Sequence, residues 1–126
     1  MKLKKKEISC AVIVEVEGKL IGGPDNSDKF HSFFKSLLSE GKNKIIVNLR
    51  KTPWADSRGI GMLIGAHTSL KKAGGELVLA HVIDRIGDIL VITNLNLLFK
   101  TFDNIDEAVK YLCVELPKKE KNTAKA

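Results

Sequence analysis

The stretch PWADSRGIGMLIG, residues 53–65, joins an apolar run to an apolar segment punctuated by glycines. The run before it, Lys44 to Leu49, is short and bounded by turn residues, which is typical of a buried central strand. From Gly59 onward the apolar residues recur at helical spacing. Asp56 and Ser57 lie at the junction, where a short polar side chain accepts backbone N–H groups of the first helical turn. The stretch therefore predicts a strand that leads into a helix, with Asp56 or Ser57 as the N-cap.

Strand and helix patterns alternate on both sides of this junction. Residues 8–16 are rich in β-branched side chains and predict a first strand, and Leu20 and Ile21 predict a short returning strand. Helices are expected after Pro24, from Asp84 and after Asp103 or Asn104, and further strands at 76–82 and 97–102. We therefore expect an α/β fold, a single domain with a mixed, mainly parallel sheet of four to five strands and about four helices.

Basic residues concentrate at the two ends of the chain. The formal net charge is +6, but eight of the 21 basic residues lie within residues 2–6 and 118–125. We expect a basic N-terminal segment at 1–7, the folded domain at 8–116 and a disordered basic tail at 117–126. Aromatic residues do not interleave with the basic ones, and no nucleic-acid-binding motif is present, so direct nucleic-acid binding is not expected.

The two cysteines, Cys10 and Cys113, fall in apolar stretches without metal-ligand spacing. This pattern predicts buried free thiols in a reducing compartment. No apolar run approaches the roughly 20 residues that a membrane span needs, and no signal peptide is recognisable. The expected location is the cytoplasm.

Catalytic motifs are missing from the sequence. Gly59, Gly61 and Gly65 do not complete a dinucleotide fingerprint, and no Walker-type phosphate loop is present. The three histidines, at positions 31, 67 and 81, are scattered, and no Ser-His-Asp set can be assembled. The sequence predicts no enzyme, no metal site and no cofactor.

Ser57 is also a candidate for phosphorylation. A serine on an exposed loop beside a helix N-terminus can receive a phosphate, whose charge the free N–H groups of the first turn partly accommodate. Asp56 would repel that charge. Phosphorylation would add about −1.5 to −2 charges and so change the electrostatics of the loop.

Residues 44–82 resemble the centre of a STAS domain, the fold shared by anti-sigma factor antagonists and the tails of sulfate transporters. The matching parts are the strand, the Asp-Ser-x-Gly-Ile-Gly loop, the helix that ends in Lys-Lys-Ala-Gly-Gly, and the following strand. EGKL at 17–20 resembles the early turn of the family, and LVITNLNLLFKTFDNIDEAV at 90–109 resembles its C-terminal segment. The resemblance covers about residues 8–115.

The resemblance implies a regulatory role. An antagonist of this family binds, when dephosphorylated, an anti-sigma factor that is a serine kinase of the histidine-kinase-like ATPase fold. Phosphorylation on the serine after the loop aspartate, here Ser57, releases it, and a metal-dependent serine phosphatase resets it. We expect the partner-binding residues to lie in and after this loop: Trp54, Asp56, Ser57, Arg58, Gly59, Ile60 and Met62. Trp54 is open to two interpretations, an exposed anchor or a residue packed on the core.

Two positions depart from the family pattern. Arg58 stands where a small residue is usual, and its guanidinium could pair with a phosphate or obstruct a kinase. After the early turn, residues 21–24 carry no acid, and Asp25 is displaced. The alternative function is a STAS module that is not phosphorylated, in a sensory complex or in a lipid-transport ABC system.

Overall fold

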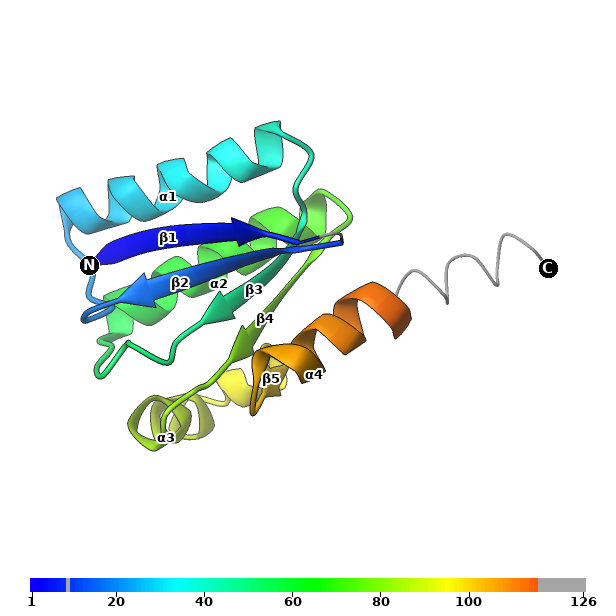
Figure 1. Ribbon diagram of the computed structural model, residues 1–126. Coiled ribbons are helices and arrows are strands. Elements are labelled where there is room, and N and C mark those ends of the chain that lie inside the picture. The colour runs from blue at the N-terminus through cyan, green and yellow to red at the C-terminus, as the bar shows by residue number, and fades with distance from the viewer. Residues whose placement is uncertain (9, 116–126) are drawn as a thin grey trace.

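A computed structural model describes residues 1–8 and 10–115 of the chain, and the side chains up to residue 113. Five strands form one sheet in the order β1-β2-β3-β4-β5 (Figure 1). They are β1 (Lys2–Glu7), β2 (Val12–Glu17), β3 (Lys44–Asn48), β4 (Glu76–Ala80) and β5 (Thr101–Phe102). β1 pairs antiparallel with β2, and the other neighbours are parallel. The predicted mixed, mainly parallel sheet is confirmed.

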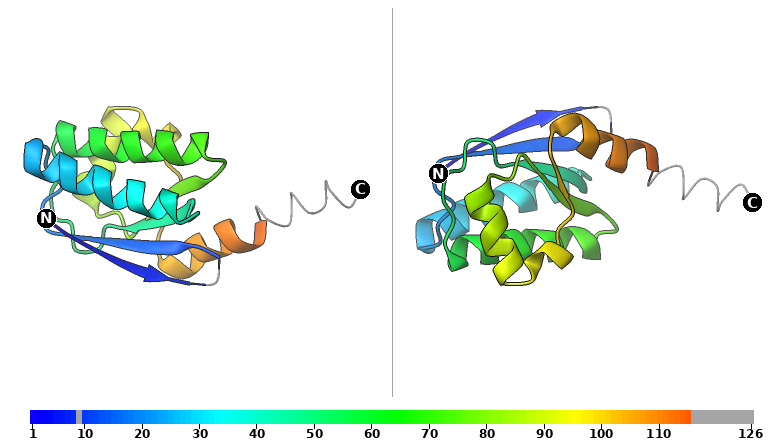
Figure 2. Two further views of the ribbon diagram at one scale, coloured as in Figure 1. Left: turned by 90° about the horizontal axis from the view of Figure 1, so that it is seen from above. Right: turned by 90° about the horizontal axis from the view of Figure 1, so that it is seen from below.

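Helices cover the two faces of the sheet unequally (Figure 2). On one face, α1 (Pro24–Ser39), α2 (Ser57–Lys72) and α3 (Asp84–Ile92) pack on a large core that includes Val14, Val47 and Leu79. On the other face, α4 (Ile105–Lys110) and the short π-helix η2 (Tyr111–Glu115) cover a smaller cluster. A short helix, η1 (Leu95–Leu97), follows α3. The four predicted helices are confirmed, and Asn104 caps the last of them, because its side chain accepts the N–H of Glu107 at 2.9 Å.

The lysine-rich N-terminus is part of the sheet. The predicted basic segment at 1–7 is instead strand β1, and the strand expected at 8–16 is the second strand, β2. Leu3 lies opposite Val16 and packs against the large core, while the lysines of β1 are exposed. Lysines on an edge strand discourage pairing with another chain, so the charge of β1 suits its place at the edge of the sheet. The tail predicted at 117–126 lies outside the described residues.

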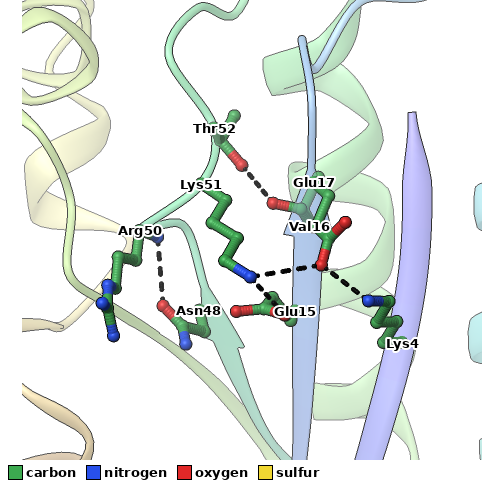
Figure 3. A network of polar contacts seen from close by, with 8 residues as sticks. All are labelled: Lys4, Glu15, Val16, Glu17, Asn48, Arg50, Lys51 and Thr52. Carbon is green, nitrogen blue, oxygen red and sulfur yellow. Dashed lines mark hydrogen bonds and ion pairs between the residues drawn. The ribbon is translucent and has the colours of Figure 1, made fainter.

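A polar network ties β1 and β2 to the connection after β3 (Figure 3). The Lys4 ammonium lies 2.9 Å from a Glu17 carboxylate oxygen, and the Lys51 ammonium lies 3.5 Å from the same oxygen. The ion pair with Lys4 is the main cause that lowers the pKa of Glu17. On the part of this sheet face that α4 does not cover, ion pairs between lysines and glutamates therefore link the neighbouring segments.

Cys10 and Cys113 form a disulfide, so the prediction of two free thiols is wrong. Cys10 lies in the connection from β1 to β2, and Cys113 lies in η2. The packing of α4 on the sheet brings their Cα atoms to 5.6 Å, although the residues are 103 positions apart in sequence. A disulfide between residues so far apart depends on tertiary packing, and the local sequence around each cysteine does not predict it.

Candidate functional site

The strand-to-helix junction after β3 is built around the cap of α2. Asp56 is the N-cap residue, with an extended backbone, and its carboxylate accepts the N–H of Gly59 at 2.7 Å. Ser57 is the first residue of the helix. The sequence allowed either Asp56 or Ser57 as the N-cap. In the structure Asp56 caps the helix, so the Ser57 hydroxyl is not used for capping. Ser57 is exposed to solvent.

A second loop is fastened to this junction. Leu20 forms an isolated parallel bridge with Ala55, donating its N–H to the Trp54 carbonyl at 2.8 Å and accepting the Asp56 N–H at 3.2 Å. The same Asp56 oxygen that caps α2 also accepts the N–H of Gly22 at 3.2 Å. The predicted returning strand at 20–21 is therefore a bridge to the site loop, and the two loops form one backbone-bonded unit.

Two glycines allow this close approach. A β-carbon at position 59 would collide with the Leu20 carbonyl oxygen, and one at position 22 would collide with the Arg58 side chain. The N-terminus of α2 therefore rests directly on the backbone of residues 20–22. The same contact places the aliphatic part of the Arg58 side chain against Gly22, so only the guanidinium end of that side chain extends into solvent.

Thr52 anchors the approach to the site, a role that was not predicted from the sequence. Its buried hydroxyl donates to the Val16 carbonyl at 2.7 Å (Figure 3). The Gly18 N–H donates to the Lys51 carbonyl at 3.0 Å. These bonds attach the chain after β3 to the end of β2. Because an unpaired buried hydroxyl is unfavourable, the position of residue 52 is well determined. In the sequence, the only local indication of this role is the Thr52-Pro53 pair shortly after the buried strand.

The electrostatics of the site are dominated by the backbone. Hydrogen bonds from Gly59 and then from Gly22 lower the pKa of Asp56, and the nearby Arg58 acts in the same direction, while burial opposes them. Asp56 is therefore a carboxylate at neutral pH. The Arg58 guanidinium lies 3.6 Å from the other Asp56 oxygen, and its side chain is 70% exposed. An exposed ion pair of this kind is weak, so the guanidinium is free to turn toward another anion.

The predicted site residues divide into a surface set and a supporting set. Trp54 is 41% exposed, which favours the interpretation as a surface anchor. Ser57 and Arg58 are exposed, and Asp56 and Met62 are partly exposed. Gly59 and Ile60 are buried, with Ile60 3% exposed in the large core. These two residues support the loop and do not present surface to a partner.

The histidines do not join this site. His67 is buried in α2 with its ring edge against Phe99, at 5.3 Å between centroids, and burial lowers its pKa. His31 is exposed on α1, and His81 follows β4. Within residues 1–8 and 10–115, no group of three His, Cys, Asp or Glu side chains could hold a metal ion. None of the helices in that part of the chain is long and apolar enough to cross a membrane.

The sequence of the chain matches a known family. The model of the STAS domain matches residues 2–108. The chain belongs to the STAS family. The match begins within β1, in agreement with the five-stranded sheet described above.

Relatives of this STAS protein are named for a regulatory role. It is 32% identical over 89 residues, covering 68% of this chain and 79% of the relative, to a Thermotoga neapolitana protein provisionally named an anti-sigma factor antagonist. A crystal structure of a Thermotoga maritima protein of the same provisional name has a TM-score of 0.75 at 25% identity, with 87% of this chain and 93% of that chain covered.

A more distant likeness concerns the fold alone. The Bacillus cell fate determinant SpoIIAA in its phosphorylated form has a TM-score of 0.68 at 16% identity. The superposition covers 86% of this chain and 97% of SpoIIAA.

Proposed function

We propose that this STAS protein is an anti-sigma factor antagonist that acts by partner switching and is phosphorylated on Ser57. The observation that carries the proposal is the exposed Ser57 hydroxyl at the first position of α2, left free because Asp56 caps the helix. The provisional name of the Thermotoga neapolitana relative and the existence of a phosphorylated form of SpoIIAA support it. The protein is then a substrate and a binding partner in the cytoplasm and not an enzyme.

The chemistry is supplied by the partner, an anti-sigma factor with the fold of histidine-kinase-like ATPases. The Ser57 oxygen attacks the γ-phosphorus of ATP, the bond to the β-phosphate breaks, ADP leaves, and the serine proton passes to a base of the kinase. A metal-dependent serine phosphatase then transfers the phosphoryl group to water. The surface offered to the kinase consists of Trp54, Ser57, Arg58 and Met62, in which Trp54 is the aromatic anchor.

Release follows from charge. A phosphate at position 57 brings about −1.5 to −2 charges next to the Asp56 carboxylate. A partner surface that fits the neutral serine would then meet two adjacent anions, the Asp56 carboxylate and the phosphate, and the single charge of Arg58 offsets only part of them, which is unfavourable. The partner complex therefore dissociates.

The test begins with capture of the partner. Immobilised chain with Ser57→Ala should retain an ATPase of the histidine-kinase-like fold from lysate of the source cells, and chain with phosphoserine installed at position 57 should not. The retained ATPase, given ATP and unaltered chain, should add one phosphate, located at Ser57 by mass spectrometry. Ser36→Ala, a change on the exposed side of α1, serves as the matched control. Equal retention by the Ser57→Ala chain and the phosphoserine chain would contradict the proposal.

A second candidate function is favoured by Arg58. The large, exposed guanidinium directly after Ser57 could exclude a kinase, which would leave a STAS module that docks without being phosphorylated. The same capture experiment separates the two functions. Retention of a transporter ATPase, with no phosphate transferred to Ser57, would support a component of a lipid-transport ABC system.

A further inference from the structure

The Cys10–Cys113 disulfide is a covalent tie between the first two strands and the last helical segment of the described chain. Cys10 lies shortly before β2, and Ser57 follows β3. Because β2 and β3 are parallel, the start of one and the end of the other lie at opposite ends of the sheet. The disulfide is therefore remote from Ser57 and takes no part in the candidate site.

The disulfide is open to attack from solvent. Both cysteine side chains are partly exposed. A hollow of about 220 Å³ reaches Cys10, and its other border is the chain from Gly41 to Lys44. Thiol–disulfide exchange requires that a thiolate reach one of the two sulfur atoms. The hollow provides that route to Cys10, which a disulfide enclosed in the core would lack.

The charges around the hollow suit this exchange. Lys42 and Lys44 line it, and none of the described lining residues is Asp or Glu. The Lys42 ammonium lies 3.2 Å from a Glu7 carboxylate oxygen, which offsets part of its charge. Cations beside a cysteine favour the thiolate form, and the thiolate is the species that attacks and leaves in disulfide exchange.

The disulfide holds η2 to the connection between β1 and β2. Below it, Leu112 is fully buried in the smaller cluster, and Cys10 and Cys113 pack against that cluster. The Tyr111 hydroxyl donates to a Glu76 carboxylate oxygen at 3.0 Å, which attaches η2 to β4. Reduction would leave these noncovalent contacts and remove the tie to the first two strands.

We propose that Cys10–Cys113 is a reversible redox site, which a dithiol protein of the thioredoxin type reduces in the folded chain, and that reduction frees η2 from the β1–β2 connection. Cytoplasmic disulfides are rare, and those that occur are usually transient and serve catalysis or redox sensing. The proposal rests on the cytoplasmic setting of the proposed function and does not depend on phosphorylation of Ser57.

The exchange proceeds in two steps. One thiolate of the dithiol attacks Sγ of Cys10, the bond to Cys113 breaks, and Sγ of Cys113 leaves with the electron pair and takes up a proton. The second thiolate of the dithiol then attacks its own partner sulfur in the mixed disulfide, and Cys10 leaves and is protonated. Two electrons and two protons pass to the chain, and the dithiol becomes a disulfide. Oxidised glutathione reverses the change and is reduced to two glutathione thiols.

The test uses the full, folded chain without denaturant. Thioredoxin with its reductase should consume about one NADPH per chain, and later addition of oxidised glutathione should restore the bond. Alkylation followed by intact-mass spectrometry counts the thiols at each stage. The chain with both Cys10→Ser and Cys113→Ser should consume no NADPH. A bond that thioredoxin reduces only in urea would overturn the proposal, because the disulfide would then be a structural one.

The release of η2 is tested by hydrogen exchange. Amides of residues 111–115 should exchange at least about tenfold faster in the reduced chain, while those of residues 57–60 should be unchanged. The double serine variant should exchange like the reduced chain in either buffer. Equal exchange at η2 in the oxidised and reduced chains would overturn the release.

The point of attack is tested with single variants. The Cys10 thiol of Cys113→Ser should react with an aromatic disulfide reagent several-fold faster than the Cys113 thiol of Cys10→Ser. The opposite order would overturn the assignment of the attack to Cys10. None of these measurements needs a partner protein, so their outcome is independent of the capture experiment that tests the proposed function.

Discussion

Gly59 lies against the carbonyl oxygen of Leu20, so closely that a β-carbon at position 59 would collide with it. This contact joins the first turn of α2 to the loop after β2. The Leu20–Ala55 bridge and the Asp56 hydrogen bonds to Gly22 and Gly59 depend on the same approach. The geometry around Ser57 is therefore set by backbone contacts.

The first prediction compares two glycines of α2. Gly59→Ala should lower the free energy of unfolding by about 1–3 kcal/mol, because the added carbon forces the helix away from Leu20. Gly61→Ala should raise it by up to about 1 kcal/mol, since the position is open and alanine favours helix. Urea denaturation of both variants measures the two changes. Equal effects of the two substitutions would show that the contact with Leu20 is not tight.

The second prediction concerns the charge of the cap. The pKa of Asp56 is lowered in the fold, chiefly by the Gly59 N–H, so the folded state holds a proton there less readily than the unfolded chain. The stabilisation by Asp56 is therefore present at neutral pH and is lost as the pH falls below about 4, through the folded pKa. Asp56→Asn should lower the Tm at pH 7 by a few degrees and have a smaller effect at pH 3. Asp88→Asn, on an exposed part of α3, is the control.

The third prediction concerns His67. Burial is the main cause that lowers its pKa, and the Lys71 ammonium adds to it, while the Glu76 carboxylate opposes both. The folded chain thus favours neutral imidazole against Phe99. Since the unfolded chain takes up the proton first, stability falls as the pH drops from about 6.5 through the folded pKa. The fall in Tm between pH 7 and pH 5 should be smaller in His67→Leu than in the unaltered chain. His31→Gln should retain the full fall, and identical slopes in all three proteins would refute the assignment to His67.

The fourth prediction concerns the disulfide. Reduction of the Cys10–Cys113 bond should lower the free energy of unfolding by about 2–5 kcal/mol, because the bond closes a loop of about 100 residues. A chain with both Cys10→Ser and Cys113→Ser should unfold alike with and without reductant. Thiol titration of the folded, unreduced chain should find no free thiol at these two positions. Two reactive thiols before reduction would contradict the bond.

Local patterns in the sequence predict most of the fold. The helical spacing of apolar residues predicts α1 and α2, and the buried run from Lys44 predicts β3. A cap at Asp56 or Ser57 follows from residue type and position, because short polar side chains recur where helices begin, and the structure selects Asp56. The exposure of Ser57 is also expected from its place at this junction, and the structure confirms it.

Features that depend on tertiary contacts could not be predicted from the sequence. The lysine-rich sequence of β1 does not resemble a strand. It forms one because it pairs with β2, whose Glu15 and Glu17 carboxylates lie near its lysines. Leu20 bridges Ala55 because the two loops meet at the same end of the sheet. The disulfide depends on where α4 packs. Each of these contacts joins residues that no local window of sequence includes.

The bridge between Leu20 and Ala55 has a consequence for signalling. Main-chain bonds on both sides of residue 57 hold the loop in one shape, so an added phosphoryl group has little backbone to rearrange. The two forms of the protein would then share one backbone and differ in the phosphoryl group and the charge that it carries. A binding protein would distinguish the two forms by the phosphoryl group at residue 57 and not by a change in the shape of the backbone.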